Sequence, residues 1–498
     1  MNPNLSKERF LELAAEFPVV PLAVEVLADR ETPVSVFERL VVDGDGFLLE
    51  SVEGGETWAR WSFTGWDPEF TLTSRDGISS VAGRPIELAD GDPLAVLADL
   101  LGRFGTPEAK ELGFGDPVPP LYAGCVGYLG YDAVRYVEHL PGRPPDDRSL
   151  PEMMWQFVGF LAIFDRFRQT VQLVRNVYVG DDPSRQYDEA ICHLEAAALR
   201  LGSATQYTPV DRPSFVDRPQ ARCDFTEEEF KSVVQTCIAY IKAGDAFQIV
   251  PSLRLEVDFR GDAFHVYRAL RLVNPSPFMF FVRSGGLAIT GSSPELMSRV
   301  RDGMALSRPI AGTRPRGADS AEDESLAEDL LNDPKERAEH VMLVDLARND
   351  LGRVCVYGSV SVDELMVIER YSHVMHIVSG ISGRLREGVG PVDVLRATFP
   401  HGTVTGAPKV RAMEIIDELE PVARGPYAGA VGYLDFNGNV DTAIALRTLV
   451  ISDGKAWVQA GAGIVADSDP EAEYRECLHK AEAALAAVAA VSSHLEQG

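Results

Sequence analysis

The chain has 498 residues, 45% of them hydrophobic and 24% charged, which is typical of a soluble globular protein with two domains or one large layered domain. Its 75 acidic residues outnumber its 47 lysines and arginines, giving a formal net charge of -28 that argues against nucleic-acid binding and requires local positive charge for any anionic substrate. No apolar run is long enough to span a membrane, the charged residues 1–17 do not resemble a secretion signal, and six dispersed cysteines fit reduced thiols, so we expect a cytoplasmic protein.

The first half of the chain predicts strands followed by a helix. Phe37–Val42 and Phe47–Val52 are apolar runs joined by the turn Asp43–Gly46, a pattern typical of a hairpin. Val171–Val179 alternates in hydrophobicity as a strand does, and Arg185–Leu201 predicts the helix that closes this half.

Residues 202–224 differ in composition from the rest of the chain, because they are rich in Pro, Ser, Thr, Gln and Arg. Such a segment is typical of a linker. It divides the chain into an N-terminal region, residues 15–201, and a C-terminal region, residues 225–490. Strands and helices do not alternate regularly, which favours an α+β fold over a doubly wound parallel sheet.

The C-terminal region predicts helices and long strands. A helix over Glu227–Lys242 leads to a strand over Ala246–Leu255, and the Gly/Thr/Pro loop Phe399–Lys409 leads into a helix that runs to about Glu418. Near the end, Val440–Ile451 is predicted to be one strand of a hairpin with Lys455–Ile464.

Two similar segments, residues 333–340 and 469–476, each begin with Asp-Pro and place two glutamates three residues apart: Glu336 and Glu339, then Glu473 and Glu476. Asp-Pro is a helix start signal, and Glu336 completes a capping box in the first segment. Two such helices facing each other would offer carboxylate oxygens to Mg²⁺. The alternative is that these are capping residues and solvated acids on helix surfaces.

Three further features have both a structural and a functional interpretation. Arg447 lies on an apolar face of its predicted strand, where either a bound carboxylate or an internal salt bridge would satisfy it. The run Gly461-Ala462-Gly463 would let backbone amides approach an anion. His376 alternates with apolar residues, as a hydrogen-bonded core histidine does.

Several long motifs together resemble those of the chorismate-utilising enzymes, and most of all those of anthranilate synthase large subunits (component I). They are residues 309–317 (PIAGTRPRG), residues 336–350 (ERAEHVMLVDLARND), His376, the loop 402–409 and the helix 473–480. The resemblance covers nearly the whole chain. It implies a four-layer αββα sandwich in which two antiparallel sheets face each other.

The activity that the resemblance implies is amination of chorismate at C2 by ammonia, with Mg²⁺, followed by pyruvate elimination to anthranilate, the first committed step of tryptophan biosynthesis. The implied Mg²⁺ ligands are Glu339 and Glu476, supported by Glu336 and Glu473. The implied chorismate contacts are Gly312, Thr313, Tyr427, Arg447, Gly461, Ala462, Gly463 and Lys480. The implied catalytic group comprises Glu295 as general acid for the C4 hydroxyl, His376 for pyruvate elimination, and Thr403 and Gln248.

Two positions distinguish the members of this family. Gln248 stands where the similar isochorismate and salicylate synthases carry a lysine base, and an amide cannot deprotonate water. Ala311 stands where aminodeoxychorismate synthases carry a nucleophilic lysine. Both favour direct addition of ammonia at C2. The alternatives are an aminodeoxychorismate synthase component I and a non-catalytic tryptophan-binding regulator.

Feedback inhibition is also implied, because Leu48-Leu49-Glu50-Ser51 and residues 274–279 resemble the family's tryptophan-binding elements. Tryptophan is expected near Glu50, Ser51, Pro275, Ser276 and Pro277. It would inhibit by favouring a conformation with weaker chorismate affinity. Phe278, His401 and Leu253 depart from the family pattern and leave pocket detail open.

Ammonia requires a source, and this chain lacks a convincing glutaminase motif. Cys125 has no leading glycine for a nucleophile elbow, and His193 falls within a predicted helix, so a buried cysteine and a helix-surface histidine are expected. We therefore expect a separate glutaminase subunit (component II) and a hetero-oligomer.

Overall fold

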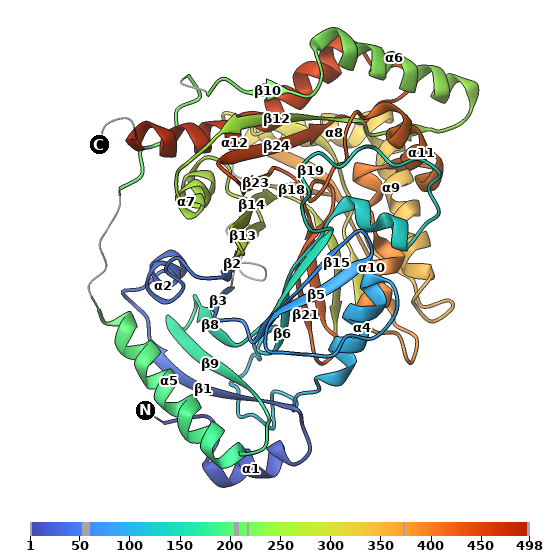
Figure 1. Ribbon diagram of the computed structural model, residues 1–498. Helices are drawn as coiled ribbons and strands as arrows, with labels where there is room; N and C mark the ends of the chain where they lie inside the picture. Colours follow the sequence, from blue (N-terminus) through green and yellow to red (C-terminus); the bar gives the residue numbers. More distant parts are fainter. Residues whose placement is uncertain (1, 52–59, 204–208, 217–218, 372–373, 496–498) are drawn as a thin grey trace.

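The computed structural model describes residues 2–51, 60–203, 209–216, 219–371 and 374–495. Two large sheets dominate this part of the chain, each of 11 strands, and their strands pair antiparallel (Figure 1). The predicted α+β class with two large antiparallel sheets is confirmed. No helix in the described ranges is long and apolar enough to cross a membrane.

The first sheet combines strands from both ends of the sequence. Its order is β1 (Val19–Leu27), β9 (Thr170–Tyr178), β8 (Phe160–Asp165), β3 (Trp61–Trp66), β2 (Gly46–Glu50), β13 (Phe278–Ser284), β14 (Leu287–Ser293), β23 (Thr448–Ser452), β24 (Lys455–Gly461), β12 (Ser252–Asp258) and β10 (Arg222–Cys223).

The second sheet is built in the same way. Its order is β17 (Ile310–Pro315), β19 (Val374–Arg384), β16 (Met304–Ser307), β15 (Leu296–Arg301), β22 (Val440–Ile444), β21 (Ala430–Asp435), β6 (Gly124–Leu129), β7 (Met153–Phe157), β4 (Phe70–Arg75) and β5 (Ile78–Gly83), and β18 (Ser361–Arg370) also pairs with β19. A small separate pair joins β11 (Gln248–Ile249) to β20 (Gly406–Ala407).

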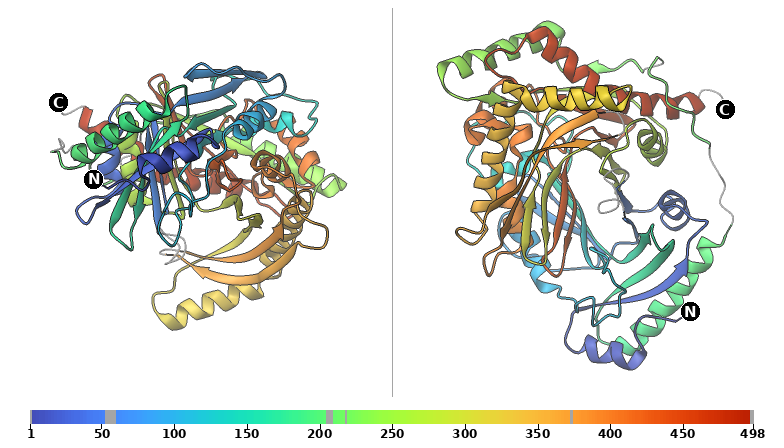
Figure 2. Two further views of the ribbon diagram at one scale, coloured as in Figure 1. Left: turned by 90° about the horizontal axis from the view of Figure 1, so that it is seen from below. Right: turned by 180° about the vertical axis from the view of Figure 1, so that it is seen from behind.

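Helices lie around the two sheets (Figure 2). Those in contact with the first sheet are α1 (Lys7–Ala14), α2 (Pro33–Leu40), α5 (Pro183–Leu201), α7 (Ala263–Val273) and α12 (Pro470–Leu495), and α6 (Glu227–Ala243) packs on α12. Those in contact with the second sheet are α4 (Pro93–Arg103), α8 (Ser320–Asn332), α9 (Pro334–Gly352) and α10 (Pro391–Thr398). The remaining elements are α11 (Lys409–Leu419) beside β20 and the short helices η1 (Tyr131–Tyr136) and η2 (Gly402–Val404).

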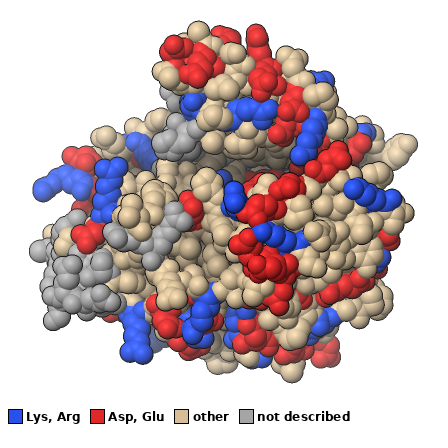
Figure 3. All heavy atoms as spheres, turned by 90° about the horizontal axis from the view of Figure 1, so that it is seen from above, with Lys and Arg blue, Asp and Glu red and all other residues tan. Residues whose placement is uncertain are grey.

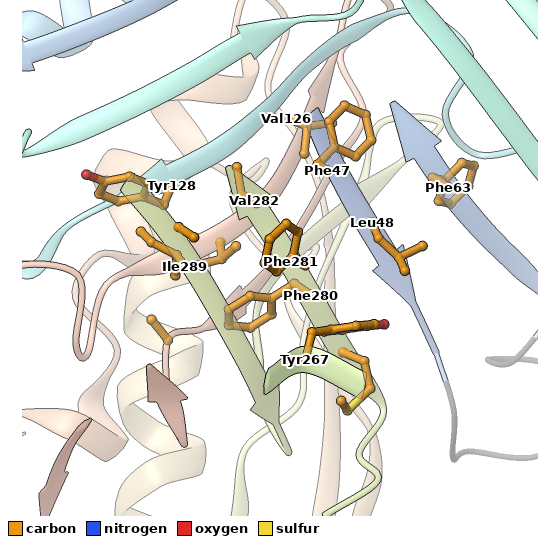
Figure 4. Packing of buried hydrophobic residues seen from close by; sticks show 14 of the residues in the cluster. Phe47, Leu48, Phe63, Val126, Tyr128, Tyr267, Phe280, Phe281, Val282 and Ile289 are labelled. Carbon is orange, nitrogen blue, oxygen red and sulfur yellow. The ribbon is translucent and has the colours of Figure 1, made fainter. Parts of the chain in front are cut away.

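The two halves of the chain share one core. β2, from the N-terminal half, pairs with β13, so that Leu48 lies opposite Phe281. Figure 4 shows Phe47 and Leu48 beside the aromatic side chains of β13, with Val126 and Tyr128 of β6 close by. These residues are fully or nearly fully buried, and burial of such side chains is the main source of folding free energy. The regional division at residues 202–224 stays a prediction about the sequence, because both sheets contain strands from either side of it.

The predicted strand over Phe37–Val42 is wrong. Phe37–Leu40 form the last turn of α2, and Val41 and Val42 follow in a turn. The helix begins with a capping box in which Thr32 and Ser35 form reciprocal hydrogen bonds. Its buried residues, Pro33, Val36, Phe37 and Leu40, follow the helical spacing of three and four. The β-branched valines suggested a strand, but the cap and the period outweigh their propensity.

The predicted strand over Val440–Ile451 is wrong as a single element. It divides into β22, in the second sheet, and β23, in the first. Arg447 lies in the crossing between the sheets with a φ of 47°, a left-handed conformation that is uncommon for arginine. Ala246–Leu255 is likewise divided, at Val250 and Pro251, into β11 and β12. Arg447, in the first break, and Gln248, in β11 just before the second, line the same cavity.

Candidate active site

A cavity of about 790 Å³ lies where the two sheets, α9, α12 and the segment around η2 meet. Its walls contain most of the side chains that the sequence singled out, from elements far apart in the chain. The predicted residues among its lining are Gln248, Glu295, Gly312, Thr313, Glu336, Glu339, His376, Thr403, Tyr427, Arg447, Gly461, Gly463, Glu473, Glu476 and Lys480. This is the volume that a small organic molecule requires. Basic and acidic side chains are interspersed over the face of the molecule seen in Figure 3.

The two acid pairs stand on two different helices. Asp333 caps α9 by accepting from the backbone N–H groups of Lys335 and Glu336. Among the described hydrogen bonds, the carboxyl of Glu336 accepts from Arg314, at 3.5 Å, and does not complete the predicted capping box. Glu473 and Glu476 lie in the first turns of α12. Both pairs are therefore available to the cavity.

Like charges in this wall affect each other. The pKa of Glu336 is raised mainly by burial and secondly by the nearby carboxylate of Glu339. Burial also raises the pKa of Glu473, and the neighbouring Glu476 adds to the effect. No three metal-ligating side chains in the described ranges are already grouped closely enough to hold a cation. The donor set still fits Mg²⁺, because it offers carboxylate oxygens from two helices to one cavity.

Two basic side chains offer contacts for an anion. Lys480 donates to the carbonyl oxygen of Gly461 at 2.9 Å and lies 2.7 Å from a carboxylate oxygen of Glu476. Arg447 donates from Nη1 to Oδ1 of Asn274 at 3.1 Å. This partner is a neutral amide and not the carboxylate of an internal salt bridge, and the binding of a substrate carboxylate by Arg447 stays a prediction.

Glu295 is buried at the base of the cavity, in the turn between β14 and β15. Its Oε1 accepts a hydrogen bond from the hydroxyl of Thr403 at 2.8 Å. Burial raises the pKa of Glu295 to about 8, so its carboxyl holds a proton at neutral pH. A protonated carboxyl facing a cavity can act as a general acid.

Gln248 and His376 are held by specific hydrogen bonds. Nε2 of Gln248 donates to Oε1 of Glu339 at 2.7 Å, and a Cβ added at Gly463 would lie 2.9 Å from that same nitrogen. Nδ1 of His376 is 2.9 Å from the carbonyl oxygen of Gly312, which places its proton there and leaves the lone pair on Nε2. Burial lowers the pKa of His376, so the ring is neutral and able to accept a proton.

A buried ion pair holds the loops that carry two of these site residues. Arg424 and Glu420 lie 2.6 Å apart, both almost fully buried. Arg424 also donates to the carbonyl oxygens of Val250 and Val404, which are close in sequence to Gln248 and Thr403. The pair therefore fixes two loops that carry site residues.

A family model described as chorismate binding enzyme matches residues 49–486. The chain belongs to the chorismate-binding enzymes. It is 44% identical to anthranilate synthase component 1 of Acetivibrio thermocellus over 98% of each chain, and 46% identical to that of Mycolicibacterium smegmatis over 99% of this chain and 95% of the relative.

Solved structures agree with this family assignment. Anthranilate synthase component I from Streptococcus pneumoniae superposes with a TM-score of 0.75 at 32% identity, covering 92% of this chain and 99% of that one. The menaquinone-specific isochorismate synthase of Escherichia coli superposes with a TM-score of 0.71 at 18% identity, covering 97% and 98%, which shows a shared fold alone.

One residue of the predicted substrate set lies outside the cavity of this chorismate-binding enzyme. The Ala462 side chain is buried in the core, and its backbone N–H donates to the carbonyl oxygen of Pro251 at 3.2 Å. The backbone amide of Ala462 is thus already hydrogen-bonded and Ala462 is not among the residues that line the cavity, and its contact with substrate stays a prediction.

The predicted inhibitor elements occupy two adjacent places. Pro275, Ser276 and Pro277 line the same cavity. Glu50 is buried outside it and accepts hydrogen bonds from Tyr267 and Arg271. Ser51 follows Glu50 at the end of β2, next to residues 52–59, which lie outside the described ranges. Because Glu50 lies opposite Met279 on β13, the two elements are connected through one strand pair.

Sequence reasoning missed several lining residues. Lys335 stands at the mouth beside Glu473, on the neighbouring helix, and His479 and Asn274 also line the cavity. Lys335 could have been found because it precedes Glu336 directly. Asn274 lies within the motif that was singled out, but its contact with Arg447 depends on tertiary structure. The expectations for Cys125 and His193 are confirmed, since Cys125 is buried in β6 and His193 is exposed on α5.

Proposed function

We propose that this chain is the large component of an anthranilate synthase, which adds ammonia to C2 of chorismate and releases pyruvate. The observation that carries the proposal is the polar wall of the cavity, where Gln248 is bonded to Glu339 and Ala311 stands beside Gly312. An amide and a methyl group provide neither a base for water nor a covalent nucleophile. Sequence identity of 43–46% to proteins named anthranilate synthase component 1 supports the same proposed activity.

The four glutamates at the mouth would hold Mg²⁺, which would offset their charge and that of the substrate's ring carboxylate. The residues are Glu336, Glu339, Glu473 and Glu476. Arg447 and Lys480 would bind substrate carboxylates by charge-assisted hydrogen bonds. This arrangement supplies the local positive charge that an acidic protein needs for a dianionic substrate.

The chemical steps use groups whose protonation fits their tasks. As the nitrogen of ammonia bonds to C2, both ring double bonds shift by one position and the C4–O bond breaks, and Glu295 gives its proton so that the hydroxyl leaves as water. The ammonium group formed at C2 then loses one proton and becomes the amine. Removal of the C2 proton then accompanies cleavage of the C3–O bond and release of pyruvate. His376, neutral and with its lone pair on Nε2, assists this elimination.

Three further parts belong to the proposal. Ammonia comes from a separate glutaminase subunit in a hetero-oligomer, because Cys125 and His193 are structural residues of β6 and α5. Tryptophan inhibits by binding near Glu50, Ser51 and residues 275–277, where the β2–β13 pair connects to the cavity. The enzyme works in the cytoplasm with Mg²⁺ as its cofactor.

Incubation of the purified chain with chorismate, Mg²⁺ and ammonium tests the proposal. Anthranilate fluorescence is expected without any glutaminase. A 4-amino product would instead identify an aminodeoxychorismate synthase. Absence of any product, together with tryptophan binding, would identify a non-catalytic regulator.

A further inference from the structure

His401 forms a chain of contacts to the proposed general acid. Nδ1 of His401 is 3.1 Å from the hydroxyl of Thr403, and that hydroxyl is 2.8 Å from Oε1 of Glu295. His401 and Glu295 are both 3% exposed, so water hardly competes for these contacts. Nε2 of His401 is buried with no hydrogen-bond partner among the described residues. Burying a polar atom without a hydrogen bond costs folding free energy, so packing alone does not explain a histidine at this position.

The backbone fixes which nitrogen of His401 carries the proton. The N–H of Thr403 donates to Nδ1 at 3.3 Å, so Nδ1 is an acceptor and the proton is on Nε2. Nδ1 can then also accept from the Thr403 hydroxyl. That hydroxyl has one proton and two acceptors within reach, Nδ1 of His401 and the carboxylate of Glu295.

The competition has two outcomes that depend on Glu295. When Glu295 is ionised, its carboxylate accepts the hydrogen bond that the Thr403 hydroxyl donates. When Glu295 is protonated, its O–H donates to the Thr403 oxygen, and the Thr403 hydroxyl turns to Nδ1 of His401. The second arrangement contains one more hydrogen bond than the first, because the Thr403 hydroxyl both accepts from Glu295 and donates to Nδ1, so the histidine favours the acid form of Glu295.

We propose that His401 is a positioning residue for Glu295. By accepting the hydrogen bond of the Thr403 hydroxyl, His401 keeps the carboxyl of Glu295 in its acid form. The inference rests on the proposed function, in which Glu295 protonates the leaving hydroxyl. His401 acts through Thr403 and need not touch the substrate.

The charge state of the surroundings agrees with this role. Burial lowers the pKa of His401 to about 3, with a smaller contribution from Lys409, so the ring is neutral and its 3.7 Å approach to Glu295 is not an ion pair. Lys409 is itself paired with Asp350 of α9 at 2.8 Å. Besides Glu295, the charged or titratable groups that line the cavity are His376, Arg447, Lys335, Lys480, His479, Tyr371, Tyr427, Glu336, Glu339, Glu473 and Glu476.

The pH dependence of kcat/KM in His401→Leu tests the proposal, because leucine keeps water out of the site but cannot accept a hydrogen bond from Thr403. Without the histidine, Thr403 donates its hydrogen bond to the Glu295 carboxylate alone. The midpoint of the fall in kcat/KM at alkaline pH should therefore shift to lower pH by roughly half to one unit. His401→Asn, whose amide oxygen can replace Nδ1, should restore the midpoint. If His401 served only as the N-cap of η2, its loss would weaken the Thr403–Glu295 hydrogen bond and shift the alkaline fall in kcat/KM to higher pH. A shift to higher pH, or no shift, therefore overturns the proposal.

A second measurement does not depend on activity. The infrared C=O band of protonated Glu295, assigned by its loss in Glu295→Gln, is titrated in the unmodified chain and in the variants. His401→Leu should lower its midpoint, and in a Thr403→Val background the same substitution should change nothing, because the connecting hydroxyl is gone. An equal shift in both backgrounds contradicts the proposal. If the chain makes no anthranilate yet the band behaves as expected, the proposed function fails while the coupling stands.

Discussion

Arg447 and Asn274 join the substrate cavity to the loop that carries the predicted inhibitor residues. Nη1 of Arg447 donates to Oδ1 of Asn274 at 3.1 Å, across 173 positions of sequence. Asn274 is followed directly by Pro275, Ser276 and Pro277, which line the same cavity. A ligand that moves this loop must therefore also move the side chain proposed to bind a chorismate carboxylate, which gives inhibition a direct physical route.

Asn274→Ala should raise the KM for chorismate about five- to tenfold and change kcat less, because Arg447 loses the acceptor that fixes its guanidinium before substrate binds. Steady-state kinetics with ammonium as the nitrogen source measures this. Asn332→Ala, at an exposed position that ends α8, is the control. An unchanged KM would mean that Arg447 is positioned by other contacts.

Glu339→Gln and Glu476→Gln should each raise the Mg²⁺ concentration for half-maximal activity by roughly 10²-fold or more, since even residues behind metal ligands contribute tenfold to a hundredfold. Metal titration of the activity measures the change. Glu471→Gln is the matched control, because Glu471 is also on α12 but pairs with Arg475 and Lys231. Normal Mg²⁺ dependence in either cavity variant would refute the metal assignment.

Glu295 should make activity depend on pH with a defined sign. Burial raises the pKa of Glu295 to about 8, the acid form exists below that pH, and kcat/KM should therefore fall as the pH rises through about 8. Glu295→Gln should lower kcat by roughly 10²- to 10⁴-fold and remove this limb from any residual activity. A Gln variant of normal activity would show that another group protonates the leaving hydroxyl.

Gly463→Ala should disturb Gln248 without unfolding the protein. The new Cβ would lie 2.9 Å from Nε2 of Gln248, too close for contact, so the amide must leave Glu339. We expect kcat/KM to fall about tenfold, the worth of one hydrogen bond to a charged group. Circular dichroism checks the fold. Gly352→Ala, where an added Cβ meets nothing within 4 Å, should behave like the unmodified chain.

Arg424→Met should lower the free energy of unfolding by about 3–5 kcal/mol, because it leaves the buried carboxylate of Glu420 without its cation. Urea denaturation measures the loss. The double variant Arg424→Met with Glu420→Met should recover part of the stability, since no charge then stays buried and unpaired. Equal instability of the single and double variants would mean that the backbone contacts of Arg424, and not its charge, stabilise the site.

The sequence by itself determined the local elements and the chemical inventory. Asp-Pro start signals predicted where α9 and α12 begin, and α5 and α6 lie within two residues of the helices predicted over Arg185–Leu201 and Glu227–Lys242, whereas α4, α7 and α8 were not predicted. The long motifs determined the family, because a run such as residues 336–350 is specific enough to identify it. These features depend on neighbours within a turn or two of the chain, which local sequence encodes.

Tertiary structure alone decided how these pieces meet. Packing divided Val440–Ile451 between two sheets and turned Arg447 toward Asn274. It buried Ala462 and set Thr403 beside Glu295, which is 108 positions away in the sequence. The physical reason is that each outcome depends on burial and on hydrogen bonds between distant segments, or on the cavity that they enclose. No local pattern of residue types records those contacts.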